Sequence, residues 1–134
     1  MNIEQRIEIF LAAPAFGVVG ASANPDKYGH KVLRCYLQHG HQAIPVNPVE
    51  ATIAGQSCVK SVGELPDEVA SISVITPPSV TEQVVEQAIA RGIKNIWMQP
   101  GAESPAAIAA CAAAGINLIA DGSCLLVVMG YHEH

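Results

Sequence analysis

The sequence predicts a three-layer α/β domain with a mainly parallel, doubly wound sheet of about five strands. Three observations favour this fold class. Short apolar runs alternate with segments whose apolar residues recur at helical spacing, as parallel strands joined by helical crossovers require. Of the residues, 50% are hydrophobic and only 14% are charged, which suits strands covered on both faces. The length of 134 residues accommodates one complete core, so we expect a single domain over residues 1–134.

The first segment, residues 1–13, is expected to form a short amphipathic helix packed on the domain. Ile3, Ile7 and Phe10 recur at helical spacing, and Pro14 ends the pattern. This segment lacks the basic and then apolar profile of a signal peptide, and no stretch is apolar over the length of a membrane span. We therefore expect a cytoplasmic protein without a membrane partner.

The next unit combines a strand, a loop and a helix. Residues 15–21 form an apolar run of strand length, and residues 22–26 have the composition of a turn. Apolar residues between Val32 and Leu37 mark one face of the following helix, which Gly40 ends as a C-terminal cap. The unit forms the first half of a βαβ motif.

The same alternation continues through the rest of the chain. One helix has its apolar face between Val80 and Ile89, and another begins at Pro105, after the N-cap Ser104, and runs to Gly115. The expected strands cover residues 42–46, 69–76, 94–98 and 116–120, with a weak edge strand near Cys58 and Val59.

Ligands of doubly wound sheets bind beyond the carboxyl ends of the strands, where the strand order reverses. The residues that follow the predicted strands are small, hydroxylated or rigid, and almost none is charged. This composition favours recognition by backbone hydrogen bonds and shape over catalysis, and the chain has neither a GxSxG motif nor obvious paired carboxylates. The strand ends are Gly20, Ala21 and Ser22; Asn47 and Pro48; Thr76, Pro77 and Pro78; Gln99, Pro100 and Gly101; and residues 121–124.

The first of these loops has the features of a phosphate site. Gly17 and Gly20 permit close packing of strand and helix, and the helix N-terminus offers free N–H groups and its positive dipole to an anion. The glycine spacing matches neither GxGxxG nor a P-loop, so a tight turn without a ligand is the alternative interpretation. Four basic residues cluster around the same helix start: Lys27, His30, Lys31 and Arg34.

Charge and cysteine usage argue against several classes of function. Seven basic and twelve acidic residues give a net charge of −5 without a Lys/Arg run, which argues against binding to nucleic acid. The chain has no CxxC pair, HExxH motif or Cys/His cluster, so we expect no metal site. The cysteines are expected to be reduced thiols: Cys35, Cys58, Cys111 and Cys124.

A NAD-binding domain carries an acidic residue at the end of its second strand, where it holds the ribose hydroxyls. Here that position is Asn47 followed by Pro48, and Glu50 would reach it only through a loop excursion. This position argues against classical NAD binding, and an NAD(P)-binding domain of the oxidoreductase type stays open as the alternative function.

These motifs resemble, in their order, those of the small stand-alone CoA-binding proteins, which are Rossmann-like relatives of the N-terminal domain of the succinyl-CoA synthetase alpha subunit. The resemblance covers the chain from about Phe16 to Cys124. Its markers are the loop Gly20, Ala21 and Ser22; the turn Pro45, Val46, Asn47 and Pro48; Thr76, Pro77 and Pro78; residues 97–102; and Asp121 with Cys124.

The resemblance implies a site for coenzyme A, with residue roles carried over by matching position. It implies that Gly20, Ala21 and Ser22 hold the phosphates, with Lys27 in reach of one, and that Val46, Asn47 and Pro48 line the adenosine region. It further implies that Thr76, Pro77 and Pro78 border the pantetheine path, with Gln99 and Cys124 nearer the thiol end. The synthetase has a lysine in its second-strand turn, and this chain has none between Asn47 and Glu50.

The resemblance favours a module that binds CoA or an acyl-CoA and senses, carries or presents it without catalysis. The synthetase needs a second domain with a phosphorylated histidine, for which this chain has no room, so we expect no enzyme activity. Two further alternatives stay open. In the first, the chain is a redox-responsive module in which Cys124 forms a mixed disulfide with the cofactor thiol. In the second, it is an interaction domain with a vestigial pocket. The sequence identifies no protein partner.

Overall fold

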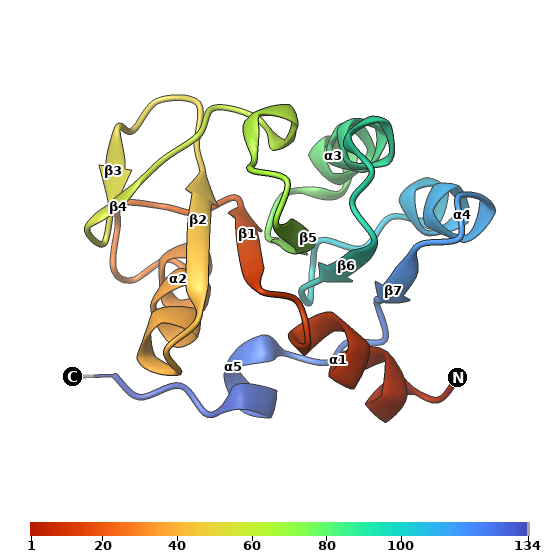
Figure 1. Ribbon diagram of the computed structural model, residues 1–134, viewed down its shortest axis with the longest axis horizontal. Helices are drawn as coiled ribbons and strands as arrows, with labels where there is room; N and C mark the ends of the chain where they lie inside the picture. The colour runs from red at the N-terminus through yellow and green to blue at the C-terminus, as the bar shows by residue number, and fades with distance from the viewer. Residues whose placement is uncertain (134) are drawn as a thin grey trace.

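The computed structural model describes residues 1–133 and has the α/β architecture that the sequence predicts (Figure 1). Five parallel strands form the main sheet in the order β2-β1-β5-β6-β7. Because β2 lies on one side of β1 and β5 on the other, the strand order reverses at β1. The strands are β1 (Ala15–Val19), β2 (Gln42–Val46), β5 (Val69–Val74), β6 (Asn95–Met98) and β7 (Asn117–Ile119).

Helices cover both faces of this sheet and complete the three layers. Helices α3 (Pro78–Arg91) and α4 (Pro105–Ala113) lie on one face (Figure 1). The opposite face carries α1 (Ile3–Leu11), α2 (Tyr28–Gln38) and α5 (Leu125–Met129). The predicted N-terminal helix is thus confirmed, and it packs against β6 and β7 at one end of the sheet.

Two hydrophobic cores of different character fill the spaces between the layers. The core beneath α1 and α2 is aromatic, because Phe10 meets Trp97 edge to face at 5.4 Å between ring centroids and Phe16 stacks on Tyr36 at 4.6 Å. All four side chains are fully buried. The core beneath α3 and α4 is aliphatic. Aromatic pairs of this geometry contribute about 0.5–1.5 kcal/mol beyond the burial of their area.

The ends of the helices follow the local signals in the sequence. Asn2 and Gln5 form a reciprocal capping box at the start of α1. Ser104 caps α4, and Pro105 occupies its first position, as predicted. Gly92 ends α3 with a φ of 83°.

The segment between β2 and β5 differs from the expectation of an edge strand. A short hairpin forms from β3 (Thr52–Ile53) and β4 (Gln56–Ser57), and Val59 then makes one isolated parallel bridge to Val46. Helix α5 was not predicted, because its five residues are apolar throughout and too few to display a helical period.

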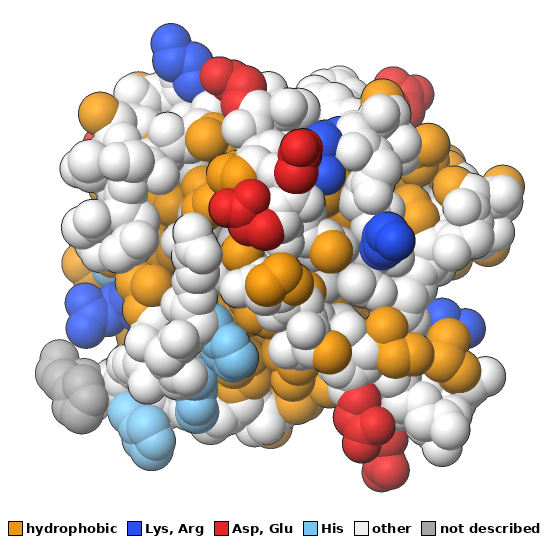
Figure 2. All heavy atoms as spheres, viewed as in Figure 1, with side chains coloured by type: hydrophobic (Ala, Val, Ile, Leu, Met, Phe, Trp, Pro, Cys, Tyr) orange, Lys and Arg blue, Asp and Glu red, His pale blue; other side chains and the backbone are white. Residues whose placement is uncertain are grey.

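The described residues place further limits on the molecule. No helix in residues 1–133 combines the length and the apolar character that a membrane crossing requires. Within the same range the four cysteines are free thiols, and no three His, Cys, Asp or Glu side chains gather where they could hold a metal ion. On the face shown in Figure 2, the Lys and Arg side chains lie singly among acidic and apolar ones.

Candidate nucleotide-binding site

The carboxyl ends of β1, β2 and β5 surround a cavity of about 220 Å³. It lies where the strand order reverses, which is where doubly wound sheets bind their ligands. Its walls also include the segment that leads into the short helix η1 (Val62–Glu64) and the face of α3 between Val80 and Gln87. This switch-point cavity is lined by Val19, Gly20, Ala21, Val46, Asn47, Pro48, Lys60, Ser61, Val62, Thr76, Val80, Val84 and Gln87.

Two glycines allow the first loop to pass between β5 and α2. Gly20 has a φ of 94°, and a Cβ atom there would lie 2.0 Å from the carbonyl oxygen of Ile75. A Cβ atom at Gly29 would lie 2.1 Å from the carbonyl oxygen of Gly20. Gly17 lies elsewhere, since its Cβ would meet Leu65 and Ile72 at 3.0 Å. The close approach of strand and helix therefore depends on Gly20 and Gly29 rather than on Gly17.

Two of the four basic residues around the start of α2, His30 and Lys31, are engaged within the protein. The ring atom Nδ1 of the buried His30 lies 2.8 Å from the carbonyl oxygen of Ser22, so this nitrogen is the donor and the contact stabilises the loop. Lys31 forms an ion pair with Glu133 at 2.6 Å. Lys27 is exposed at the N-cap of α2 and gives no side-chain cap. The cluster thus offers less positive charge to an anion than its sequence indicates.

Asn47 ties the end of β2 to the first loop with both ends of its amide. Its Nδ2 donates to the carbonyl oxygen of Ala21 at 3.0 Å. Its Oδ1 accepts from the backbone N–H groups of Val49 and Glu50 at 2.8 and 3.0 Å. A carboxylate could not donate to Ala21, so the asparagine is required by the geometry of the loops.

A second cavity of about 240 Å³ continues along the carboxyl edge. It is lined by Ile75, Thr76, Pro77, Pro100, Gly101 and Ala102. Thr76 lines both cavities, so the two are neighbours. The Thr76 hydroxyl bonds that of the buried Thr81 at 2.7 Å, which fixes the start of α3 against β5.

At the β6 and β7 end, Tyr28, Gln99 and Cys124 form a hydrogen-bonded cluster. The fully buried Gln99 accepts at Oε1 from the Tyr28 hydroxyl and from the Leu125 backbone N–H, both at 2.9 Å. The Tyr28 oxygen lies 2.5 Å from Cys124 Sγ. Because the phenol gives its one proton to Gln99, the Cys124 thiol donates to Tyr28. Burial raises the pKa of Tyr28 far above its ordinary value, so the phenol stays protonated.

Gln99 Nε2 is the one buried side-chain polar atom without a hydrogen-bond partner among the described residues. A buried amide N–H without a partner costs about 1–3 kcal/mol. The cluster of Tyr28, Gln99 and Cys124 therefore includes one hydrogen-bond donor, Gln99 Nε2, that the protein itself leaves unpaired within the described residues.

Asp121 closes a turn instead of entering the site. Its Oδ1 accepts from the Ser123 backbone N–H at 3.0 Å. The hydrogen bonds from the Ser123 side chain and backbone lower the pKa of this carboxyl, although Asp121 is exposed. Asp121 therefore stabilises the turn that precedes α5.

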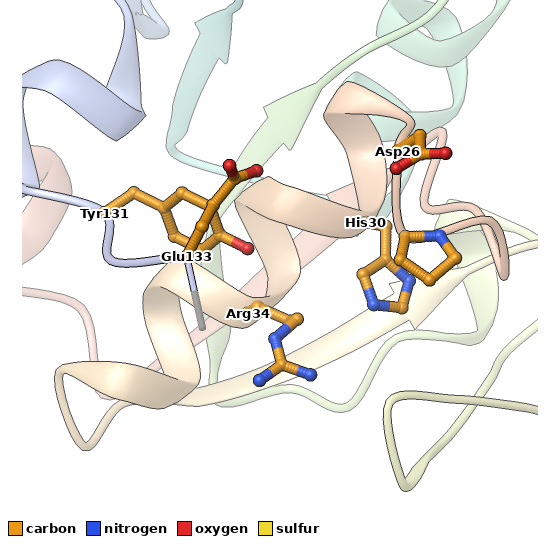
Figure 3. A pocket seen from close by; sticks show the side chains of 6 residues that line it. Asp26, His30, Arg34, Tyr131 and Glu133 are labelled. Atoms are coloured by element: carbon orange, nitrogen blue, oxygen red, sulfur yellow. The ribbon is translucent and has the colours of Figure 1, made fainter.

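The C-terminal residues lie along α2. Gln38 exchanges two hydrogen bonds with the His132 backbone, and His39 Nε2 contacts the Gly130 carbonyl oxygen at 3.0 Å. A separate cavity of about 290 Å³, lined by charges of both signs, lies between the C-terminal residues and the first half of α2 (Figure 3). It is lined by Pro25, Asp26, His30, Arg34, Tyr131 and Glu133.

Comparison with known protein families identifies the fold and the cavity as parts of one recurrent domain. The model of a CoA binding domain matches residues 15–129. The chain belongs to this CoA-binding domain family. The match begins at the first strand of the main sheet and includes the switch-point cavity, the second cavity and the Tyr28 cluster.

The chain is similar both to parts of larger enzymes and to proteins of its own size. It is 32% and 29% identical to the alpha subunits of the ADP-forming acetate–CoA ligases I and II of Pyrococcus furiosus, over 67% of this chain in each case. It spans only about a fifth of those subunits, 21% and 20%. A conserved hypothetical protein of Pyrococcus furiosus has a solved structure with a TM-score of 0.81 and 40% identity, covering 85% of this chain and 97% of that one.

Nine of the twelve predicted site residues lie at the switch-point cavity, at the second cavity or in the Tyr28 cluster. Pro77 lines the second cavity, and Gln99 and Cys124 belong to the Tyr28 cluster. Ser22, Lys27 and Pro78 line neither cavity. The wall of the switch-point cavity contains Gly20, Ala21, Val46, Asn47, Pro48 and Thr76.

Sequence reasoning missed three polar residues on the wall of the switch-point cavity, Lys60, Ser61 and Gln87. The first two follow Val59, which pairs with β2. A strict application of the strand-end rule to the weak apolar stretch at Cys58 and Val59 would have included them. No signal in the sequence selects Gln87, which reaches the cavity from the third turn of α3.

Proposed function

We propose that the chain binds coenzyme A or an acyl-CoA along the carboxyl edge of its sheet and catalyses no reaction with it. The observation that carries this proposal is the switch-point cavity, whose walls are the strand ends Gly20 to Ala21, Asn47 to Pro48 and Thr76. CoA is a long molecule, and two neighbouring cavities that share Thr76 suit an elongated ligand better than a compact one.

The parts of CoA are assigned along this edge in order. The pyrophosphate would lie against the first loop, Gly20 to Ser22, and would face the backbone N–H groups at the start of α2. The exposed Lys27 at the N-cap of α2 would reach a phosphate through solvent. Val46, Asn47 and Pro48 would line the adenosine. Thr76, Pro77 and Pro78 would border the pantetheine, which leads toward Gln99 and Cys124 at the thiol end.

The absence of catalysis is proposed from the chemistry of the cavity wall. Lys60 is the only ionisable side chain among the lining residues of the switch-point cavity, and the second cavity has none. General acid–base catalysis needs a titratable group within hydrogen-bond reach of the reacting atoms. The acetate–CoA ligase activity named for the relatives belongs to subunits about five times as long as the matched region.

The same wall argues against NAD as the ligand. An acidic residue after the second strand would hold a free ribose diol. Asn47 occupies that position, and both ends of its amide are committed to the backbone of Ala21, Val49 and Glu50.

Thermal unfolding with CoA, acetyl-CoA, NAD, NADP and ATP in parallel tests the proposed function. A ligand at 100 times its Kd that binds only the native state adds about 2.7 kcal/mol of stability, which raises Tm by roughly 5–10 °C for a domain of this size. We expect this rise with CoA and acetyl-CoA and not with the other three. A rise with NAD or NADP alone would contradict the proposal, and no rise with any ligand would favour an interaction domain.

A further inference from the structure

The wall of the switch-point cavity carries one positively charged side chain that does not belong to the strand-end motifs. Lys60 lines it, is exposed, and forms no ion pair with any residue of the described range 1–133. We propose that Lys60 binds a phosphate on the ribose of the nucleotide and so makes the chain select ribose-phosphorylated ligands. This inference rests on the proposed function and specifies which part of CoA the cavity recognises.

The backbone places Lys60 beside the end of β2. Val59 pairs with β2 through its N–H, which donates to Pro45 O at 3.0 Å, and through its carbonyl, which accepts from the Asn47 N–H at 2.9 Å. Val59 therefore acts as one residue of an additional parallel strand. Lys60, the next residue, emerges at the same carboxyl edge as Asn47 and Pro48.

The end of the second strand is where doubly wound sheets meet the ribose of a nucleotide. An acidic residue there accepts hydrogen bonds from a free diol and repels a phosphate, whereas a basic residue accommodates the phosphate. Asn47 fills neither role, because its Oδ1 already accepts from the Val49 and Glu50 N–H groups and the side chain has no positive charge to balance a phosphate. The turn that follows it, Pro48 to Glu50, holds no cation.

The other charged groups at this edge do not replace Lys60. Lys27 lies at the N-cap of α2 and lines neither the switch-point cavity nor the second cavity. Ser61, also on the cavity wall, donates its hydroxyl proton to the Glu64 carboxylate at 3.3 Å. Lys60 is the only positively charged side chain among the lining residues. Glu50 is exposed and lines neither cavity.

The test compares CoA with dephospho-CoA, which lacks only the 3′-phosphate on the ribose. Dissociation constants are measured by isothermal titration calorimetry for the wild-type protein, Lys60→Met and the control Lys94→Met. Lys94 is also exposed, but it precedes β6 at the amino edge of the sheet. Methionine keeps most of the length of the side chain and removes its charge.

We expect the wild-type protein and Lys94→Met to bind CoA about tenfold more tightly than dephospho-CoA, as one solvated charge-assisted contact allows. Lys60→Met should lose this preference with no change in its affinity for dephospho-CoA. Raising the salt concentration should narrow the preference of the wild-type protein, because the lysine is exposed.

Two results would overturn the inference while the proposed function stands. One is equal binding of both compounds by the wild-type protein, and the other is an unchanged preference for CoA in Lys60→Met. An equal loss of both affinities in Lys60→Met would also contradict a role specific to the ribose phosphate. If neither compound binds the wild-type protein, the proposed function fails, and this inference fails with it.

Discussion

The two ends of the carboxyl edge of the sheet differ in how they are built. At the open end, formed by β1, β2 and β5, backbone and small side chains leave the switch-point cavity accessible. At the closed end, beside β6 and β7, hydrogen bonds join Tyr28, Gln99 and Cys124 to one another. The open end depends on Gly20 and Gly29, where a Cβ atom would lie within about 2 Å of a backbone oxygen, and the closed end depends on side-chain hydrogen bonds that leave Gln99 Nε2 without a partner among the described residues. The difference teaches that the backbone preforms the open end, and that a ligand group entering the closed end would compete with hydrogen bonds within the protein.

The largest effect is expected from Gly20→Ala, which tests whether the backbone forms the open end. The new Cβ would lie 2.0 Å from Ile75 O at a φ of 94°. We expect the free energy of unfolding to fall by about 3 kcal/mol or more, measured by urea denaturation. The control Gly115→Ala, at a φ of 71° with open space around it, should lose only about 1–2 kcal/mol. Equal losses would mean that the close approach to β5 is not required.

The next effect is expected from Asn47→Asp, which removes the donor to Ala21 O and keeps the acceptor for Val49 and Glu50. We expect a loss of about 1–3 kcal/mol of stability and weaker binding of CoA, without a gain of NAD binding. The control Asn24→Asp keeps its one accepted bond from the Asp26 N–H and should change stability little. An Asn47→Asp protein as stable as the wild type would show that the brace between the two loops is dispensable.

A smaller effect is expected at the closed end from Tyr28→Phe. The change removes the acceptor of the Cys124 thiol and a donor to Gln99, so Cys124 should be alkylated several-fold faster at about 1 kcal/mol of cost to stability. Intact-mass analysis after iodoacetamide treatment measures this rate. Cys35 and Cys111 should stay unmodified, because burial raises the pKa of each thiol to about 11. The matched control is Tyr131→Phe, because the Tyr131 hydroxyl makes no hydrogen bond with any residue of the range 1–133.

The same mass measurement separates the redox-responsive alternative from plain binding. Incubation with CoA disulfide should give no adduct in the wild-type protein, since the Cys124 thiol is held by Tyr28. An adduct that forms in the wild type and disappears in Cys124→Ser would support the redox-responsive alternative instead.

The smallest effect concerns Asp121, which caps a turn of the closed end. Hydrogen bonds from Ser123 hold its folded-state pKa below the unfolded value of about 3.9, so its contribution to stability is full above that value and is lost as the pH falls below it. Because the carboxylate is exposed, Asp121→Asn should cost only a few tenths of a kcal/mol near pH 7 and almost nothing at about pH 2. Asp67→Asn, whose carboxylate accepts no hydrogen bond within residues 1–133, serves as the control. A cost that is independent of pH would contradict this role of the Asp121 charge.

The sequence predicts the open end far better than the closed one, and the reason is physical. Strands, helices and caps are encoded locally, so the alternation of apolar runs with helical patterns, and the cap at Ser104, were enough to predict a parallel sheet of five strands. The residues after each strand then follow from the topology. Asn47 and Thr76 reach the cavity by this rule.

The closed end depends on contacts between residues far apart in the sequence. Tyr28 meets Gln99 and Cys124 across 71 and 96 positions, and no local pattern encodes such pairs. The same holds for the C-terminal segment on α2, where Lys31 meets Glu133, so the basic cluster looked freer in the sequence than it is. Lys60 follows the weak apolar stretch at Cys58 and Val59, which forms only a one-residue bridge to β2, so the signal of a strand end at this position was weak.

The dissociation constant of CoA for a matched pair of variants on α3 tests most directly whether the switch-point cavity is the binding site. Val80 lines the cavity and Ile89 does not, yet both side chains are 40% exposed on the same helix. A cavity filled by Val80→Phe should weaken CoA binding by at least about tenfold, whereas Ile89→Phe should bind as the wild-type protein does. Unchanged binding of CoA by a folded Val80→Phe protein would contradict the account.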